Sequence, residues 1–372
     1  MWDIASEKRF WINKSILNFE KTTLVTSRTF RSPNRYLQAK QSTSMIIKDF
    51  KPFNGQHCET TATGSLLYQL DIELSEPMLF GLGEGLGYIF WNMKIMDFPF
   101  IGGRVKPDVL TENICRNLNL NLEVKETSSI KKAWKNVKDC IDNGKSVGLK
   151  LDCFHLDYFT SKIHFAGHYA SIYGYHNEIA YLNDTNQQGR DARTTLKSLE
   201  LARNEKGPMS SRNRSYTITK TEELPDLKNV IKKAINNNAT EFLNPPIKNI
   251  GYKGIYKTSS EIKKWFKTSE NIKKDFQTSA SLMERGGTGG SLFRNIYRDF
   301  LKESSTILES KELEEASESY REIAILWKKV ADLFVKIGDT EDIAYVNQVS
   351  EILVELSEKE RVTMDKLKNA SA

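Results

Sequence analysis

Apolar and polar residues follow a helical period over the last third of the chain. Between residues 323 and 334 the apolar side chains fall at i, i+3, i+4 and i+7, which places them on one face of a helix. The segment 340–369 carries a second amphipathic pattern. We therefore predict a mainly α-helical region over residues 226–372, with the stripe of 323–334 in its core.

Residues 45–200 show a different pattern, in which helical segments lie mostly early and short apolar strands follow. One helical segment ends at Gly144, a residue that suits a helix C-cap. Two strands are joined by the turn 176–178. This order predicts an α+β domain with helices packed on an antiparallel sheet. The predicted helices are 60–70, 107–118 and 130–143, and the predicted strands are 146–151, 168–175 and 179–182.

Two polar segments divide the chain. The first is rich in Ser, Thr, Lys, Arg and Asn, and is interpreted as a basic leader, either a flexible arm or an extension upstream of a natural start at Met45. The second contains Gly207-Pro208 and is predicted to be a linker or surface loop. The predicted organisation is a leader over 1–44, an α+β domain over 45–200, a linker over 201–225 and a helical domain over 226–372.

Composition and charge narrow the class of protein. Hydrophobic residues make up 39% of the 372-residue chain and aromatic residues 10%, enough for a folded core. The apolar runs are shorter than a membrane span, so no membrane contact is expected. The net charge is +6, but residues 1–44 contribute +5 of it. The remaining chain is near neutral and lacks a basic stripe interleaved with aromatic residues, so we expect no nucleic-acid partner.

The four cysteines occur as single residues, with no Cys-x-x-Cys spacing. This pattern argues against a disulfide framework and against a paired Cys–His zinc site, so no metal is expected. Free thiols are typical of a reducing compartment, and we expect a cytoplasmic protein. The cysteines are Cys58, Cys115, Cys140 and Cys153.

Cys58 is the strongest candidate for chemistry. It follows a polar, glycine-containing turn over residues 54–57 and begins a helix-forming stretch. A thiol in the first turn of a helix faces unpaired backbone N–H groups and the positive end of the helix dipole, which both stabilise the thiolate. We predict that Cys58 is a nucleophile, and the competing interpretation is a buried structural cysteine.

A histidine and a carboxylate follow Cys58 in the order of a nucleophile, base and orienter of the papain type. His168 begins a strand, and Asp184 follows the end of the next strand, sixteen residues later. Asn183 is the alternative orienter, because alternate side chains of a strand point to opposite faces. A turn-starting role is the competing interpretation of Asp184. The histidines that compete with His168 are His57, His155, His164 and His176.

An oxyanion hole needs hydrogen-bond donors beside the carbonyl that is attacked. The backbone N–H of Cys58 is one donor, and the side-chain amides of Gln56 and Asn54 are candidates for another. Glu84, within a glycine-rich run, is a third candidate on the substrate side. The run itself, residues 81–87, does not follow a strand as a dinucleotide-binding motif would, so close backbone packing is predicted.

A second glycine-rich segment, residues 286–290, precedes a predicted helix. It could cradle a phosphate, including that of a phosphopantetheine arm. A flexible linker capped by Ser291 is an equally good interpretation. Both remain open.

These motifs resemble those of the butirosin-biosynthesis acyltransferase family. The resemblance of residues 45–186 rests on Gly55 to Glu59, on Ser75-Glu76 with the glycine run, and on Gly167-His168-Tyr169. Residues 215–340 resemble the helical domain of undefined role that often follows, and the leader has no counterpart. This second resemblance rests on residues 286–294 and 320–324.

The resemblance implies a papain-like N-terminal domain and an acyltransferase activity. Such an enzyme moves an acyl or aminoacyl group from a carrier-protein thioester to an amine, through an acyl-cysteine. By resemblance, Cys58, His168 and Asp184 take the nucleophile, base and orienter positions. An acyl carrier protein and a small-molecule amine are the implied partners, and the donor carries the phosphopantetheine, so no bound cofactor is expected. The alternatives are a cysteine peptidase or amidase with the same triad, and an inert module that binds an acyl carrier.

Overall fold

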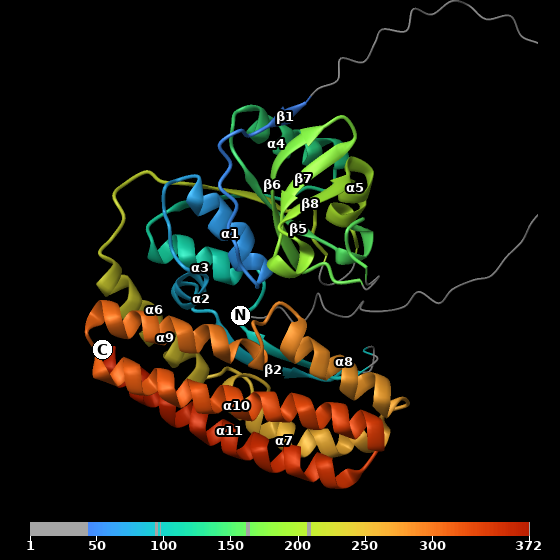
Figure 1. The fold of residues 1–372 in the computed structure, drawn as a ribbon, viewed down its shortest axis with the longest axis vertical. Coiled ribbons are helices and arrows are strands. Elements are labelled where there is room, and N and C mark those ends of the chain that lie inside the picture. The colour runs from blue at the N-terminus through green and yellow to red at the C-terminus, as the bar shows by residue number, and fades with distance from the viewer. Residues whose placement is uncertain (1–43, 94–95, 97, 161–163, 207–209, 372) are drawn as a thin grey trace, which may run out of the picture.

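The computed structural model describes residues 44–93, 96, 98–160, 164–206 and 210–371. It has an upper part built around a β-sheet and a lower part of long helices (Figure 1). This confirms the predicted α+β class, with an antiparallel sheet in the N-terminal region and a helical C-terminal region. The prediction for the leader falls on residues 1–43, which lie outside the described residues.

The main sheet has seven strands, and all its neighbouring strands are antiparallel. Its order is β4-β9-β5-β6-β7-β8, and β1 pairs with β6 as well. The two strands predicted from the turn 176–178 form the hairpin β6–β7, with Asn177 at a positive φ of 53°. The strands are β1 (Met45–Ile46), β4 (Asn121–Lys125), β5 (Val147–Leu151), β6 (His168–His176), β7 (Ile179–Asn183), β8 (Asp191–Thr195) and β9 (Ser215–Thr219).

Helices cover both faces of this sheet. Alternation along β6 sends Tyr169 into a core shared with α1 and α3, and Ala170 into a second core shared with α4 and α5. The helices here are α1 (Cys58–Tyr68), α2 (Glu76–Leu82), α3 (Val109–Asn117), α4 (Ile130–Asp142) and α5 (Leu196–Asn204), with short 3-10 helices η1 (Cys153–His155) and η2 (Asn186–Gln188).

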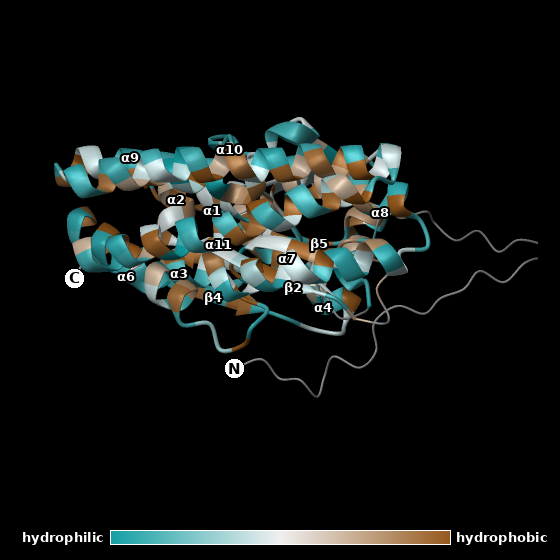
Figure 2. Ribbon diagram, turned by 90° about the horizontal axis from the view of Figure 1, so that it is seen from below, coloured by the Kyte–Doolittle hydropathy of each residue, from teal (hydrophilic) through white to brown (hydrophobic). Residues whose placement is uncertain are grey.

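The C-terminal part is a helical layer, and a two-stranded sheet of β2 (Leu86–Trp91) and β3 (Phe100–Arg104) packs on it. Figure 2 shows hydrophilic residues along the outward sides of its helices. The apolar stripe predicted over 323–334 lies on α10 and is buried, with Trp327 fully inaccessible to solvent. The elements are α6 (Leu227–Leu243), α7 (Gly251–Thr268), α8 (Ile272–Arg285), η3 (Ser291–Phe293), α9 (Arg294–Leu308), α10 (Lys311–Thr340) and α11 (Ile343–Ala370).

One continuous core joins the two parts. It runs from Phe53 and Leu66, beside α1, through Phe80 on α2 to Phe300 on α9. The glycine run allows this close approach, because a Cβ at Gly81 would lie 2.2 Å from the Phe300 ring. The prediction of close backbone packing for this run is therefore confirmed, and α2 is seated directly on the C-terminal helices.

The segment predicted as a linker differs from that interpretation. Residues 215–219 form β9, an inner strand between β4 and β5. Tyr216 and Ile218 supply the buried face at the period of a strand. The linker interpretation rested on Gly207-Pro208 and the cluster of Ser, Arg and Asn residues that precedes this strand, although Thr and Tyr within the strand both favour strands.

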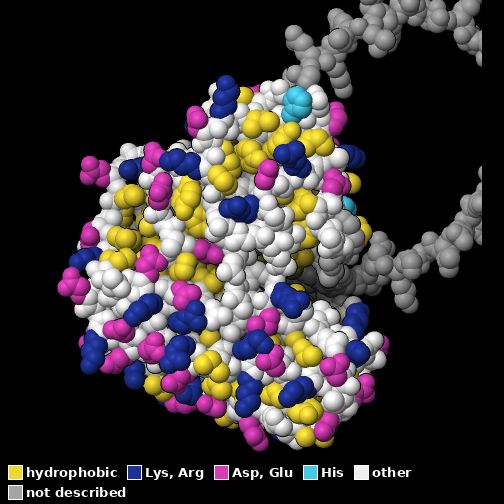
Figure 3. All heavy atoms as spheres, viewed as in Figure 1, with side chains coloured by type: hydrophobic (Ala, Val, Ile, Leu, Met, Phe, Trp, Pro, Cys, Tyr) yellow, Lys and Arg dark blue, Asp and Glu magenta, His cyan; other side chains and the backbone are white. Residues whose placement is uncertain are grey.

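The distribution of charge on the surface agrees with the near-neutral charge predicted for the chain after residue 44. Figure 3 shows Lys and Arg side chains interspersed with Asp and Glu side chains over the face in view. In the part of the chain that the structure describes, no helix is both long enough and apolar enough to span a bilayer.

Candidate active site

Cys58 is the first residue of α1 and is half-buried, with a free thiol. The N-cap residue, His57, has extended backbone angles (φ −94°, ψ 130°) and makes no side-chain cap hydrogen bond. The first turn of α1 is thus not capped by the side chain that precedes it. A helix N-terminus of this kind favours an anion, including a thiolate.

The turn before Cys58 is held by the carboxylate of Glu76, on α2. It accepts hydrogen bonds from the backbone N–H groups of Gln56 (2.9 Å) and His57 (2.8 Å) and from the Thr60 hydroxyl (2.8 Å). Glycine is required at position 55, because a Cβ there would lie 2.5 Å from the Thr61 Oγ1 and 2.9 Å from Glu76. The turn is therefore a rigid part of the α1–α2 unit.

His168 and Asp184 meet at the ends of β6 and β7. The His168 Nε2 lies 2.7 Å from an Asp184 carboxylate oxygen, and both side chains are buried. The same oxygen accepts a hydrogen bond from the Tyr158 hydroxyl (2.6 Å), and the other accepts one from the Thr185 N–H (2.6 Å). With Nε2 bound to the carboxylate, Nδ1 is the ring nitrogen left to exchange a proton with a thiol.

The charges around His168 favour its protonated form. Burial alone lowers the pKa of this imidazole, but the Asp184 carboxylate and the sulfurs of Cys153 and Cys58 outweigh burial and raise the pKa well above its usual range. Cys58 contributes through a side-chain hydrogen bond. The geometry therefore suits an imidazolium that faces a thiolate.

Asn183, the alternative orienter, points to the other side of β7. Its amide donates to the Phe53 carbonyl (3.2 Å), and the Ser65 hydroxyl donates to its side-chain oxygen (3.1 Å). It therefore fastens β7 to α1, while Asp184 faces His168. This is the alternation of side chains expected along an extended strand.

The other histidines lie elsewhere. His57 is buried edge-on against the rings of Phe80 and Phe293, and burial, together with the Arg104 charge, lowers its pKa well below the usual range. The exposed His176 ends β6. Of the five histidines, His168 alone is hydrogen-bonded to Asp184. His155 and His164 form a separate cluster with Glu205.

A buried ion pair lies beside Cys58. The Arg104 guanidinium, from β3, is 2.8 Å from the Glu59 carboxylate, which also accepts hydrogen bonds from the N–H (3.2 Å) and hydroxyl (3.1 Å) of Thr111. Burial opposes the charged form of Arg104, but Glu59 and Cys58 raise its pKa. Arg104 is therefore a fixed cation next to the thiol, which favours the thiolate.

The second glycine-rich segment lies against the turn before Cys58. A Cβ at Gly287 would be 3.5 Å from the Gln56 carbonyl and 3.8 Å from the His57 Nδ1. Gly287, Gly289 and Gly290 have positive φ angles of 71°, 66° and 82°, a conformation that other residues adopt at a cost. The C-terminal domain thus contributes directly to the surroundings of Cys58.

A pocket of about 190 Å³ forms where the two parts meet. Gln56 lines it from the N-terminal part, and Arg285, the last residue of α8, lines it from the C-terminal part. Its full lining is Gln56, Asn186, Gln187, Glu284, Arg285, Gly287, Thr288 and Gly289.

The three residues predicted on the substrate side lie in three different settings in the structure. Gln56 lines the pocket, and Asn54 is exposed one residue before Gly55. Glu84 has a structural setting instead. Its carboxylate is bound by Arg116 (2.7 Å) and Asn237 (2.8 Å), which joins α3 to α6. Because these partners occupy its carboxylate, Glu84 is corrected to a residue of the domain junction.

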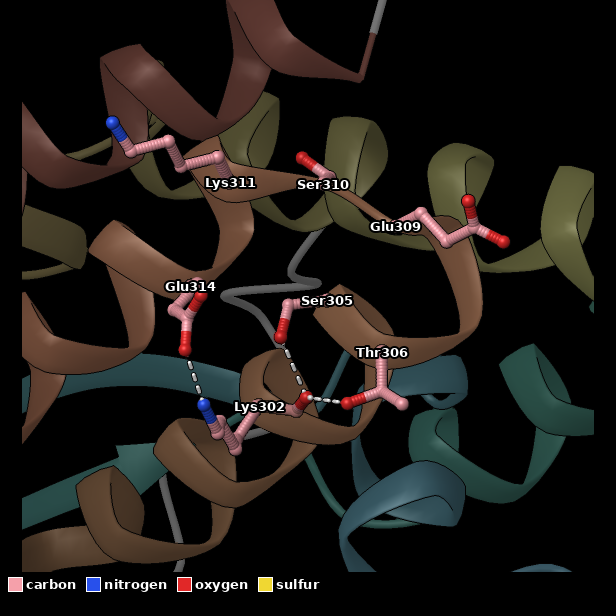
Figure 4. Close-up of a pocket in the computed structure, with 7 residues that line it drawn as sticks. All are labelled: Lys302, Ser305, Thr306, Glu309, Ser310, Lys311 and Glu314. Carbon is pink, nitrogen blue, oxygen red and sulfur yellow. Dashed lines mark hydrogen bonds and ion pairs between the residues drawn. The ribbon is translucent and has the colours of Figure 1, made fainter.

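A larger pocket, of about 300 Å³, lies between α9 and α10. Figure 4 shows Lys302 paired with Glu314, with the hydroxyl groups of Ser305 and Thr306 beside them. The Lys302 Nζ lies 2.5 Å from a Glu314 carboxylate oxygen. It contains no cysteine or histidine. This surface pocket therefore offers no nucleophile or acid–base group comparable to the site at Cys58.

Alkylation provides a direct test of the surroundings of Cys58. Burial raises the pKa of Cys115 and of Cys153 to about 12, and it also raises that of Cys140. We expect iodoacetamide to modify Cys58 well below the pH at which the other three react, as peptide mass spectrometry would measure. Equal rates in the folded protein would contradict this, and equal labelling after denaturation is the control.

The sequence analysis did not predict three residues that contribute to the site. Glu76 could have been found, because it follows Ser75 at a helix start and belongs to the motif that carried the family resemblance. No local sequence pattern marks Arg104 or Tyr158. Arg104 lies near Cys58 only because β3 packs there, and Tyr158 bonds to Asp184 only because the segment after η1 packs against it.

Comparison with protein families gives two matches. Residues 57–185 match the family described as butirosin biosynthesis protein H, N-terminal. Residues 197–367 match a domain of unknown function, DUF4872. The first match spans Cys58, His168 and Asp184, and the second contains the glycine-rich segment at the pocket. No curated protein matches the chain.

Proposed function

Because the chain belongs to the butirosin biosynthesis protein H family, we propose that it is an acyltransferase that passes an acyl group from a carrier-protein thioester to an amine. The family supports a biosynthetic enzyme, and we place it in antibiotic or related secondary metabolism. The observation that carries the finer proposal is the Cys58 thiol at the start of α1, facing a His168 imidazole bound to Asp184 at 2.7 Å.

In the first half-reaction, the Cys58 thiolate attacks the thioester carbonyl. A new C–S bond forms to Cys58, the bond to the phosphopantetheine sulfur breaks, and that sulfur takes a proton from the His168 imidazolium. Asp184 keeps the imidazole oriented throughout. The product is an acyl-Cys58 and a free carrier thiol. The donor protein supplies the phosphopantetheine, so the enzyme itself needs no bound cofactor for this step.

In the second half-reaction, neutral His168 removes a proton from the incoming amine. The nitrogen attacks acyl-Cys58, an amide bond forms, and the Cys58 thiolate leaves. The Cys58 backbone N–H and the Gln56 side chain are the donors we assign to the developing oxyanion. Glu76 holds the backbone N–H groups of Gln56 and His57, so the backbone that carries both donors is set before substrate binds.

Transfer must exclude water, since hydrolysis of acyl-Cys58 would waste the donor. We assign this task to the C-terminal domain. Its Phe293 ring stacks on Phe80 (5.5 Å between centroids), and the backbone of Gly287 lies against Gln56 and His57. The pocket that these elements form with Gln56 is the assigned position for the polar acyl group or amine. Four free cysteines fit the cytoplasm as the compartment.

The test is intact-protein mass spectrometry of the enzyme mixed with an acyl-phosphopantetheine thioester, run beside Cys58→Ala. We expect an acyl adduct that requires Cys58 and is cleared by an added amine to give an amide. Clearance only to the free acid, whatever amine is present, would support the peptidase or amidase alternative. Failure to form an adduct, combined with equal alkylation of all four cysteines, would support an inert carrier-binding module.

A further inference from the structure

A second cluster of metal-ligating side chains lies apart from Cys58. His155, in η1, and His164 meet Glu205 at the end of α5, and their ligand atoms all lie within 4.8 Å of one another. The His155 Nε2 is 2.6 Å from a Glu205 carboxylate oxygen. The three come from two segments brought together only by the fold.

The buried carboxylate of Asp152 contacts one histidine of this cluster. Asp152 is 1% exposed, and one of its oxygens lies 3.2 Å from the His164 Nδ1. Its other oxygen accepts hydrogen bonds from the N–H groups of Phe154 (2.8 Å) and Phe165 (3.3 Å). A carboxylate on the far nitrogen of a histidine fixes the tautomer and leaves Nε2 as a lone-pair donor. The Phe154 ring, stacked 4.0 Å from His164, limits its rotation.

Glu205 is also prepared to act as a ligand. The Lys206 N–H binds the Glu205 Oε1 (3.0 Å), which leaves Oε2 beside His155. Two imidazoles and one carboxylate therefore converge from ordered elements.

From this arrangement we propose that His155, His164 and Glu205 bind one zinc ion. Imidazole nitrogens and a carboxylate are ligands that zinc takes at about 2.0–2.2 Å in tetrahedral geometry, with water in the fourth position. Bonds of that length place ligand atoms roughly 3.4 Å apart. The His155 Nε2 and the Glu205 oxygen, now 2.6 Å apart, must therefore separate as the ion enters between them, and the ligand atoms, which all lie within 4.8 Å of one another, must adjust toward that spacing.

The ion would clamp the segment that carries the base. His164 lies four residues before His168, and the Phe165 carbonyl accepts a hydrogen bond from the Cys153 N–H (3.2 Å). Binding would therefore join η1, the start of β6 and the end of α5. This site departs from the expectation of no metal, which rested on cysteine spacing and did not consider a histidine–carboxylate set.

The test is calorimetric titration of zinc chloride into full-length protein freed of metal with a chelator, in a Cys58→Ala background. That background removes the thiol, which could itself bind zinc. We expect one ion per chain and a higher thermal unfolding temperature. Affinity should fall at least tenfold in His155→Ala and in the near-isosteric Glu205→Gln. His176→Ala, an exposed histidine outside the cluster, is the matched control and should bind as tightly as the parent.

Cobalt gives an independent readout. The visible absorption of bound Co²⁺ should report a nitrogen and oxygen site, without a thiolate charge-transfer band, and should be lost in Glu205→Gln. The proposal is overturned if the parent binds no ion, if His155→Ala and Glu205→Gln retain full affinity, or if binding disappears when Cys58 is replaced. None of these outcomes depends on acyl transfer, so the two proposals fail separately.

Discussion

Asp184→Ala is expected to lower the rate of acyl transfer by roughly 10⁴-fold, the size of effect seen when the carboxylate of a catalytic triad is removed. In this structure Asp184 binds His168 at 2.7 Å and is held in turn by Tyr158 and Thr185. Without it, the imidazole loses both its orientation and the charge that favours protonation. Steady-state kinetics with a carrier-protein thioester would measure the loss.

The pH profile separates this effect from simple damage to the fold. Asp184 raises the pKa of His168, so deprotonation of the thiolate–imidazolium pair should set an alkaline limb well above the usual histidine range. Removing Asp184 lowers that pKa, and the alkaline limb should move to lower pH. Asp191→Asn, at an exposed carboxylate on β8 that accepts from Tyr173 (2.7 Å), is the control and should leave both limbs in place. An unmoved limb in Asp184→Ala would contradict the assigned role.

Glu360→Ala is expected to destabilise the protein by about 3–5 kcal/mol, the range for breaking one side of a buried ion pair. Arg294 and Glu360 are fully buried, 2.8 Å apart, and Glu360 also accepts a hydrogen bond from the Trp327 indole (2.7 Å). Removing the carboxylate leaves the Arg294 guanidinium and the Trp327 indole N–H buried without the acceptor that they share. Chemical denaturation would give the difference in unfolding free energy.

The consequence should extend to the active site. Arg294 follows the glycine-rich segment and donates to the carbonyls of Leu292 (2.7 Å) and of Gly103, in β3 (3.3 Å). We expect Glu360→Ala to loosen the segment that covers Gln56. Glu358→Ala, which removes a surface partner of Arg361, is the control and should change stability little. The double variant Arg294→Met, Glu360→Leu should recover much of the loss, because it buries no charge.

Much of the candidate site could be predicted from local sequence. Cys58 stands between a polar turn and a helix, and His168 and Asp184 are one hairpin apart, so a short stretch of chain determines each position. The hairpin also limited the orienter to one of Asn183 and Asp184, because the two must point to opposite faces, and the structure decided for Asp184. Neighbouring residues determine this kind of geometry, and the hydrogen bonds of Asp184 to His168 and of Asn183 to Phe53 agree with it.

The rest depended on contacts between distant segments. The residues around Glu84 are typical of a site residue, but its structural role depends on a hydrogen bond from Asn237, 153 positions away in the chain. Arg104 lies beside Cys58 only because β3 packs there, and β9 is a strand only because β4 and β5 offer unpaired edges to it.

By itself, then, the sequence of this protein determined its α+β class, the match of residues 57–185 to the butirosin biosynthesis protein H N-terminal family, and the order of thiol, imidazole and carboxylate. The tertiary structure alone decided that the C-terminal domain shares a core with the N-terminal helices and brings Gly287 against Gln56. The physical reason is the separation along the chain over which each kind of interaction acts. Helix caps and strand alternation act over a few residues, whereas burial and ion pairing join whichever segments the completed core brings together.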